Sequence, residues 1–243
     1  MIVLKFLIQK LFFWEKRIEG VVLNIFFILV GKEIKTTISG GSEALAAIFF
    51  YLLAILIFPL GFGTDSLLLG KIAAGAIWMA ALFSSMLYLD NIFRSDFENG
   101  TLEQLVLSGI SLELIVIAKC FSHWLTNGLP IVLLSPVLSI IIGLDWQYNW
   151  ILILTLLIGT PSLTLIGAVP AALSCTIRKG GVVISLAILP LVLPILILGS
   201  GAITAEINGD GGISYLYLLG AILPISIIIV PFLGAKALRL GWE

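Results

Sequence analysis

Six apolar segments, each close to the length that crosses a lipid bilayer, follow one another through most of the chain. A transmembrane helix needs about 20 apolar residues, and soluble domains rarely contain such runs. Of the 243 residues, 60% are hydrophobic and only 11% are charged, whereas soluble globular proteins carry about 25% charged residues. The sequence therefore predicts an all-α membrane protein with six transmembrane helices. Their expected ranges are 44–62, 67–88, 113–143, 150–174, 181–203 and 215–233.

Residues 1–43 precede these segments and have a different pattern. Residues 1–17 are apolar but place their polar side chains broadly on one side, which is typical of a helix that lies in the membrane interface. The apolar run at 21–30 has about half the length of a transmembrane helix. We therefore expect an interfacial helix, with an additional tilted span as the alternative, followed by a polar elbow at 32–42. The six-span domain then occupies residues 44–243.

The basic residues are distributed unequally between the two sides of such a six-span arrangement. One side holds all the N-terminal bases together with Arg94, Lys119, Arg178, Lys179, Lys236 and Arg239. The other side holds four acidic residues and Lys71 as its one base. Lysine and arginine accumulate on the cytoplasmic side of membrane proteins. The pattern therefore predicts that both termini lie in the cytoplasm.

The sequence contains no pattern that predicts a bound nucleotide, a metal or catalysis. The glycine–lysine pairs at 31–32 and 70–71 lack the upstream glycine and the following Ser/Thr of a phosphate-binding loop. The single histidine, His123, has no neighbouring set of metal ligands and no nucleophile to assist. The bases also form no stripe of the kind that binds nucleic acid. We therefore expect neither an enzyme nor a directly bound cofactor.

The longest polar interval inside the apolar chain is residues 93–105. Thr101 followed three residues later by Gln104 predicts a capping box, in which each side chain bonds to the other residue's backbone N–H. Gly109 is a plausible helix stop. The pattern therefore predicts a helix of about two turns over 101–108.

This short helix would carry Leu102 and Leu105 on one face. Two turns are too short to be stable alone. Because the chain has no nucleotide site of its own, we expect this helix to dock on a partner protein.

His123 allows two interpretations. It could contact haem or relay protons, as ionisable residues in membrane helices often do. It could instead be a hydrogen-bonded histidine between helices. The absence of paired ligands in the sequence favours the second interpretation.

Several short motifs resemble one known family. The polar interval reads Phe93-x-x-Asp96-x-x-x-Gly100-x-Leu102-Glu103-x-Leu105. Further matches are Phe58-Pro59-Leu60-Gly61 with Gly63, Ala118-Lys119, His123-Trp124-Leu125, Gly128-Leu129-Pro130 and Leu134-Ser135-Pro136. Together they cover about residues 32–243 and resemble the haem exporter B family, CcmB, of bacterial cytochrome c maturation. Residues 1–31 lie outside the resemblance as an N-terminal extension.

The resemblance implies a six-span ABC-2-type permease in the bacterial inner membrane, paired as a homodimer. Its implied partners are the ATPase subunit CcmA, which would bind the ATP, the membrane proteins CcmC and CcmD, and the haem chaperone CcmE. Haem would be the cargo, with His123 as its candidate contact. Together with the predicted short helix, this makes the candidate ATPase-coupling residues Phe93, Asp96, Gly100, Thr101, Leu102, Glu103, Gln104 and Leu105. The alternatives are a membrane scaffold that transports nothing and an exporter of another substrate.

Overall fold

The computed structural model describes residues 22–40, 42–63, 66–89, 91–176 and 181–240, and these contain helices and no strand. The predicted interfacial helix at 1–17 lies outside the described residues. After a helix at 22–40, the elements are α2 (Ser42–Phe62), α3 (Ser66–Leu89), α4 (Asn91–Glu98), α5 (Thr101–Leu107), α6 (Leu112–His123), η1 (Trp124–Gly128), α7 (Leu129–Ile141), η2 (Trp146–Tyr148), α8 (Asn149–Thr176), α9 (Gly181–Asn208) and α10 (Ile213–Arg239).

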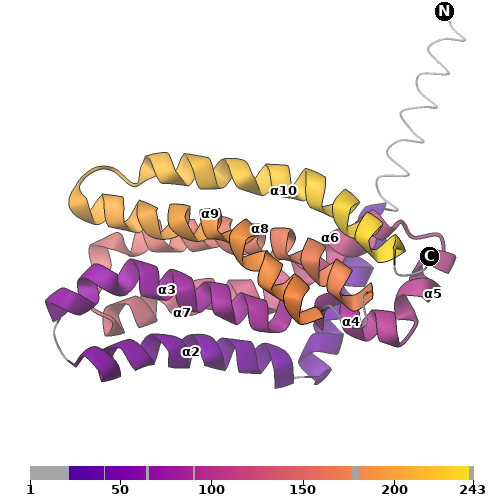
Figure 1. Ribbon diagram of the computed structural model, residues 1–243, viewed down its shortest axis with the longest axis horizontal. Coiled ribbons are helices and arrows are strands. Elements are labelled where there is room, and N and C mark those ends of the chain that lie inside the picture. The colour runs from indigo at the N-terminus through magenta and orange to yellow at the C-terminus, as the bar shows by residue number, and fades with distance from the viewer. Residues whose placement is uncertain (1–21, 41, 64–65, 90, 177–180, 241–243) are drawn as a thin grey trace, which may run out of the picture.

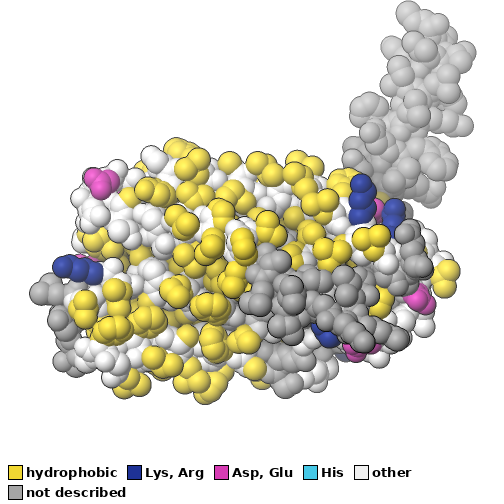
Figure 2. Space-filling model, in the orientation of Figure 1, with side chains coloured by type: hydrophobic (Ala, Val, Ile, Leu, Met, Phe, Trp, Pro, Cys, Tyr) yellow, Lys and Arg dark blue, Asp and Glu magenta, His cyan; other side chains and the backbone are white. Residues whose placement is uncertain are grey.

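Six of the described helical segments are long and apolar enough to cross a membrane. They run beside one another along the long axis of the molecule (Figure 1). Hydrophobic side chains are spread over the described part of the visible face between the two ends, and the lysines and arginines lie near the ends (Figure 2). The predicted all-α, six-span membrane fold is therefore confirmed.

The third span is a composite of α6, η1 and α7. The segment Trp124–Gly128 is π-helical, and the backbone stays helical on both sides of it. Pro130 follows at once and has no N–H to give to the carbonyl four residues earlier. A widened turn at this point accommodates the missing hydrogen bond. The irregularity therefore falls where the sequence Gly128-Leu129-Pro130 interrupts regular helix geometry.

Helix α8 lies at the centre of the bundle. It packs most extensively against α9 and α10 and also touches α3, α4, α6 and α7. Its inner face includes the fully buried small residues Ala168, Ala171 and Ala172. Small residues let helix backbones approach closely. Close packing of this kind drives helix association in a membrane, where the lipid is as apolar as the side chains.

The helix at 22–40 packs beside the end of the bundle that carries α4 and α5 (Figure 1). The Phe26 ring lies 5.7 Å from that of Phe121 on α6, and Ser122 Oγ donates to the Val30 carbonyl at 3.5 Å. Of the polar elbow predicted at 32–42, residues 32–40 form the second half of this helix, and Ser42 begins α2. The helix at 22–40 is thus held against α6 by these contacts.

Candidate functional site

The polar interval folds into two short helices, α4 and α5, at one end of the bundle (Figure 1). Gly100 joins them with φ 69°, a left-handed conformation that glycine adopts without steric cost. Its carbonyl accepts the first hydrogen bond of α5, from Gln104 N–H at 3.2 Å. The predicted capping box is wrong, because Gly100 takes the N-cap position and no side chain caps the helix. Thr101 is already the first helical residue.

The end of α5 agrees with the sequence. Gly109 has φ 83°, and its N–H bonds to the Val106 carbonyl at 3.0 Å. Ile110 N–H then reaches back to the Leu105 carbonyl at 3.4 Å. A left-handed glycine that allows such return bonds is a common way to end a helix. The predicted stop at Gly109 is therefore confirmed.

The apolar side chains of this region point in two directions. Phe93 on α4 and Leu102 on α5 are completely buried by the chain itself. Leu105 is half-buried and packs against the same core. Leu107, in contrast, is 86% exposed. Leu102 therefore fastens α5 to the bundle and does not face a partner as the sequence suggested.

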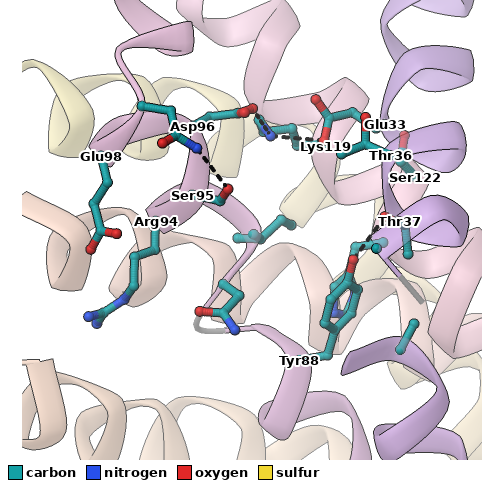
Figure 3. A pocket seen from close by; sticks show the side chains of 16 residues that line it. Glu33, Thr36, Thr37, Tyr88, Arg94, Ser95, Asp96, Glu98, Lys119 and Ser122 are labelled. Carbon is teal, nitrogen blue, oxygen red and sulfur yellow. Dashed lines mark hydrogen bonds and ion pairs between the residues drawn. The ribbon is translucent and has the colours of Figure 1, made fainter. Parts of the chain in front are cut away.

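An ion cluster joins three separate segments beneath α4. The Lys119 ammonium on α6 lies 2.5 Å from an Asp96 carboxylate oxygen on α4 and 2.9 Å from one of Glu33. The Lys119 side chain is only 4% exposed. Figure 3 shows the three side chains converging from the helix at 22–40, α4 and α6. Because an ammonium buried without partners is very costly, the two carboxylates account for the burial of Lys119.

His123 lies one turn further along α6 than Lys119 and is buried. Its ring stacks on the Tyr88 ring, with centroids 4.9 Å apart and planes at 14°. Its Nδ1 lies 3.4 Å from the Thr164 hydroxyl on α8. Its Nε2 has no hydrogen-bond partner among the described residues. His123 thus connects α3, α6 and α8 at the base of the ion cluster.

A cavity of about 390 Å³ lies between the helix at 22–40, the end of α3, α4 and α6. Asp96, Lys119 and His123 line it together, whereas the residues predicted on α5 lie elsewhere. The Tyr88 hydroxyl, 2.9 Å from that of Thr37, closes one side (Figure 3). Within the described parts of the chain, no three His, Cys, Asp or Glu residues are grouped to hold a metal ion.

Sequence reasoning missed Glu33 and Tyr88 as parts of this region. A usable signal for Glu33 was present, since a lysine inside a membrane-length segment needs a counter-charge nearby. Lys119 lies within the span Leu112–Ile141. Its acidic partners are 86 and 23 residues away in the chain, so spacing could not identify them.

Comparison with known proteins places these features in a family. The family model described as CcmB protein matches residues 24–241. The chain is 40% identical to Heme exporter protein B of Pseudomonas aeruginosa over 218 residues, which cover 90% of this chain and 98% of that protein. It is 42% identical to the Haemophilus influenzae protein of the same name over 220 residues, with coverage of 90% and 99%.

The protein of that name from Escherichia coli K12 is 40% identical over 212 residues, which cover 86% of this chain and 95% of that protein. The family match begins at residue 24, earlier than residue 32, where the motifs placed its start. The match also includes α4, α5 and the three residues of the ion cluster. This multi-pass membrane protein therefore belongs to the CcmB family.

Proposed function

We propose that this chain is a permease subunit of an ABC-type complex that moves haem across the bacterial inner membrane for c-type cytochrome biogenesis. The curated relatives named Heme exporter protein B support the cargo. The six membrane-competent helices support the role of a permease. Because the sequence has no phosphate-binding loop, the ATPase is a separate subunit.

The outer surface of α5 is the part that contacts the ATPase. Glu103, Gln104 and Leu107 are exposed there. The helix is too short to be stable alone, but buried Phe93 and Leu102 hold it against the bundle. A displacement of α5 by the ATPase is therefore transmitted to the membrane spans, because α5 is packed against them. The burial of Phe93 and Leu102 against the bundle is the observation that carries the coupling proposal.

Asp96 has a different role from the direct ATPase-coupling contact expected from the sequence. Its carboxylate pairs with buried Lys119 and so joins α4 to the third span. Glu33 extends the same connection to the helix at 22–40. Movement of α4 therefore reaches α6 through an ion pair in addition to the covalent chain.

The orientation and the partners expected from the sequence complete the proposal. The α4–α5 end faces the cytoplasm, as do both termini, because the bases outside Lys71 gather on that side. CcmA binds α5 there, and two copies of the chain form the membrane core. CcmC and CcmD complete the membrane complex, and CcmE receives haem in the periplasm.

We assign His123 to the support of this end of the bundle. An axial haem ligand needs a ring nitrogen open to a macrocycle much larger than imidazole. The His123 side chain is only 3% exposed and is stacked on Tyr88. Replacement by alanine is expected to lower thermal stability while haem delivery per folded complex is retained. Loss of delivery at unchanged stability would instead establish His123 as a haem contact.

The coupling proposal is tested by co-purification with the ATPase subunit. Leu107→Asp and Glu103→Lys on α5 are expected to reduce both the bound ATPase and its stimulation. Ile213→Asp, an exposed apolar residue at the opposite end of the bundle, serves as the control. Normal ATPase binding and stimulation in both α5 variants would contradict the proposal. An intact complex that delivers haem without ATP would favour a scaffold.

A further inference from the structure

Two cavities of opposite character adjoin at the helix 22–40. The first is the cavity of about 390 Å³ beside the ion cluster, with charged and polar walls. The second, of about 470 Å³, is walled mainly by apolar side chains of the helix at 22–40, α2 and η1. Thr37 and Ala44 belong to the walls of both. The two cavities therefore share a border at Thr37 and Ala44, and a molecule that fills both must pass the Thr37–Tyr88 contact.

The apolar cavity opens on the outer surface of the bundle. Ile38 is 70% exposed and Leu45 is 65% exposed, and both form its wall. Leu45 belongs to the first membrane-competent segment, Ala44–Phe62. The groove therefore opens where the first membrane-competent segment begins, and a lipid chain from the adjoining bilayer can reach it.

One basic and one acidic side chain of the polar cavity do not belong to the ion cluster. Lys119 is already paired with Asp96 and Glu33. Arg94 and Glu98 also line the cavity and form no ion pair with any described residue. Figure 3 shows them together on the side away from the cluster. An arginine guanidinium matches the geometry of a phosphate group, and a carboxylate attracts an ammonium.

We propose that the two cavities form one site for an aminophospholipid such as phosphatidylethanolamine. Arg94 binds the phosphate, Glu98 faces the ammonium group, and the first part of an acyl chain lies along Leu45 and Ile38. The lipid fills the space between the helix at 22–40 and α2 and so fixes how that helix lies on the bundle. This site does not depend on haem being the cargo.

The charge of the cavity selects among amphiphiles. Its wall carries three carboxylates, from Glu33, Asp96 and Glu98, against the two bases Arg94 and Lys119. The excess is negative, so a headgroup with a net negative charge is repelled. Phosphatidylglycerol and the two propionates of haem carry such charge, whereas the phosphate and ammonium of phosphatidylethanolamine balance each other. The zwitterionic lipid is therefore the expected occupant.

The test uses the full-length protein purified from bacterial membranes in mild detergent. After extensive washing, retained lipids are extracted and counted per chain by mass spectrometry, and the absorbance of porphyrin is recorded. We expect one phosphatidylethanolamine per chain to persist after phosphatidylglycerol is removed. Arg94→Gln is expected to lower this retention at least about tenfold, because a charge-assisted contact is lost.

A second variant tests the apolar half without touching a buried residue. Leu45→Trp should obstruct the groove and also release the lipid, whereas Leu53→Trp, exposed two turns further along α2, should not. Arg239→Gln, at the same end of the bundle but outside the cavity, is the charge control.

Three outcomes would overturn the proposal. The first is equal retention of the two phospholipids, which describes an ordinary lipid annulus. The second is that Arg94→Gln, or Leu45→Trp, leaves the retention of phosphatidylethanolamine unchanged. The third is a porphyrin in place of phospholipid.

Discussion

The Lys119 ammonium on α6 lies 2.5 Å from the Asp96 carboxylate on α4, within a side-chain environment that leaves Lys119 only 4% exposed. This pair joins a short helix at the end of the bundle to a membrane span. Glu33 approaches the same ammonium from a third segment, at 2.9 Å. The contribution of this pair to stability, and to the attachment of α4 to α6, can be tested by substitution.

Asp96→Asn should weaken the attachment of α4 to α6. Removal of one partner leaves the buried ammonium with Glu33 alone, and we expect a loss of about 1–3 kcal/mol in unfolding free energy. Thermal unfolding of the purified protein measures it. Glu113→Gln, which breaks the exposed pair with Arg239 at 3.3 Å, should cost about 0–1 kcal/mol. Equal losses of unfolding free energy in the two variants would show that burial does not strengthen the Asp96–Lys119 pair.

Lys119→Met should be more damaging than Asp96→Asn. It leaves two carboxylates facing each other without their cation, at a cost of about 3–5 kcal/mol. Neutralising the whole cluster with Glu33→Gln, Asp96→Asn and Lys119→Met should recover most of this loss, because replacing a complete buried ion network is often neutral. The non-additivity of the variants is the measured quantity. Additive losses would contradict a coupled cluster.

Gly159→Ala and Gly199→Ala should each disturb the packing of the bundle. A Cβ at either glycine would meet the ring of Trp78, which is completely buried between α8 and α9. Overpacking of this kind costs about 1–3 kcal/mol, and thermal unfolding detects it. Gly220→Ala, with open space around its Cβ, is the control. A smaller residue at 78 should relieve the clash, so failure of Trp78→Leu to improve Gly159→Ala would count against this contact.

Gly100→Ala should impair the joint between α4 and α5 selectively. An alanine held at φ 69° is strained by about 1–2 kcal/mol. We expect reduced stimulation of the ATPase with little change in the unfolding of the spans. Gly61→Ala, in a regular helix with open space around it, should leave stimulation unchanged. Full stimulation by Gly100→Ala would show that the angle between α4 and α5 is not important.

The six spans could be predicted because each is a long local run of apolar residues. The end of α5 at Gly109 could be predicted for the same reason, since helix termination by glycine is a local property. The capping box failed because the preceding turn needs a left-handed residue, which moves the N-cap to Gly100. A local motif was therefore displaced by the geometry of its neighbour.

The ion cluster and the direction of Leu102 could not be predicted in this way. An apolar stripe on a short helix indicates that one face is buried, but it does not identify the surface that buries it. Leu102 packs against its own bundle, and Leu107 is exposed. Glu33 and Lys119 meet only after the helix at 22–40 has packed beside α6. These features depend on contacts between distant parts of the chain.

The π-helical turn at Trp124–Gly128 lies between α6 and α7 in the third span. It therefore sets the angle by which α6 is rotated about the helix axis relative to α7. A π turn contains about one residue more than an α turn, and one residue of an α-helix corresponds to about 100°. Conversion of this turn to α-helix would therefore rotate α6 about its axis relative to α7. Lys119 would swing with it, while the far end of the span stayed in place. Such a change would twist the third span at its middle without tilting it as a whole.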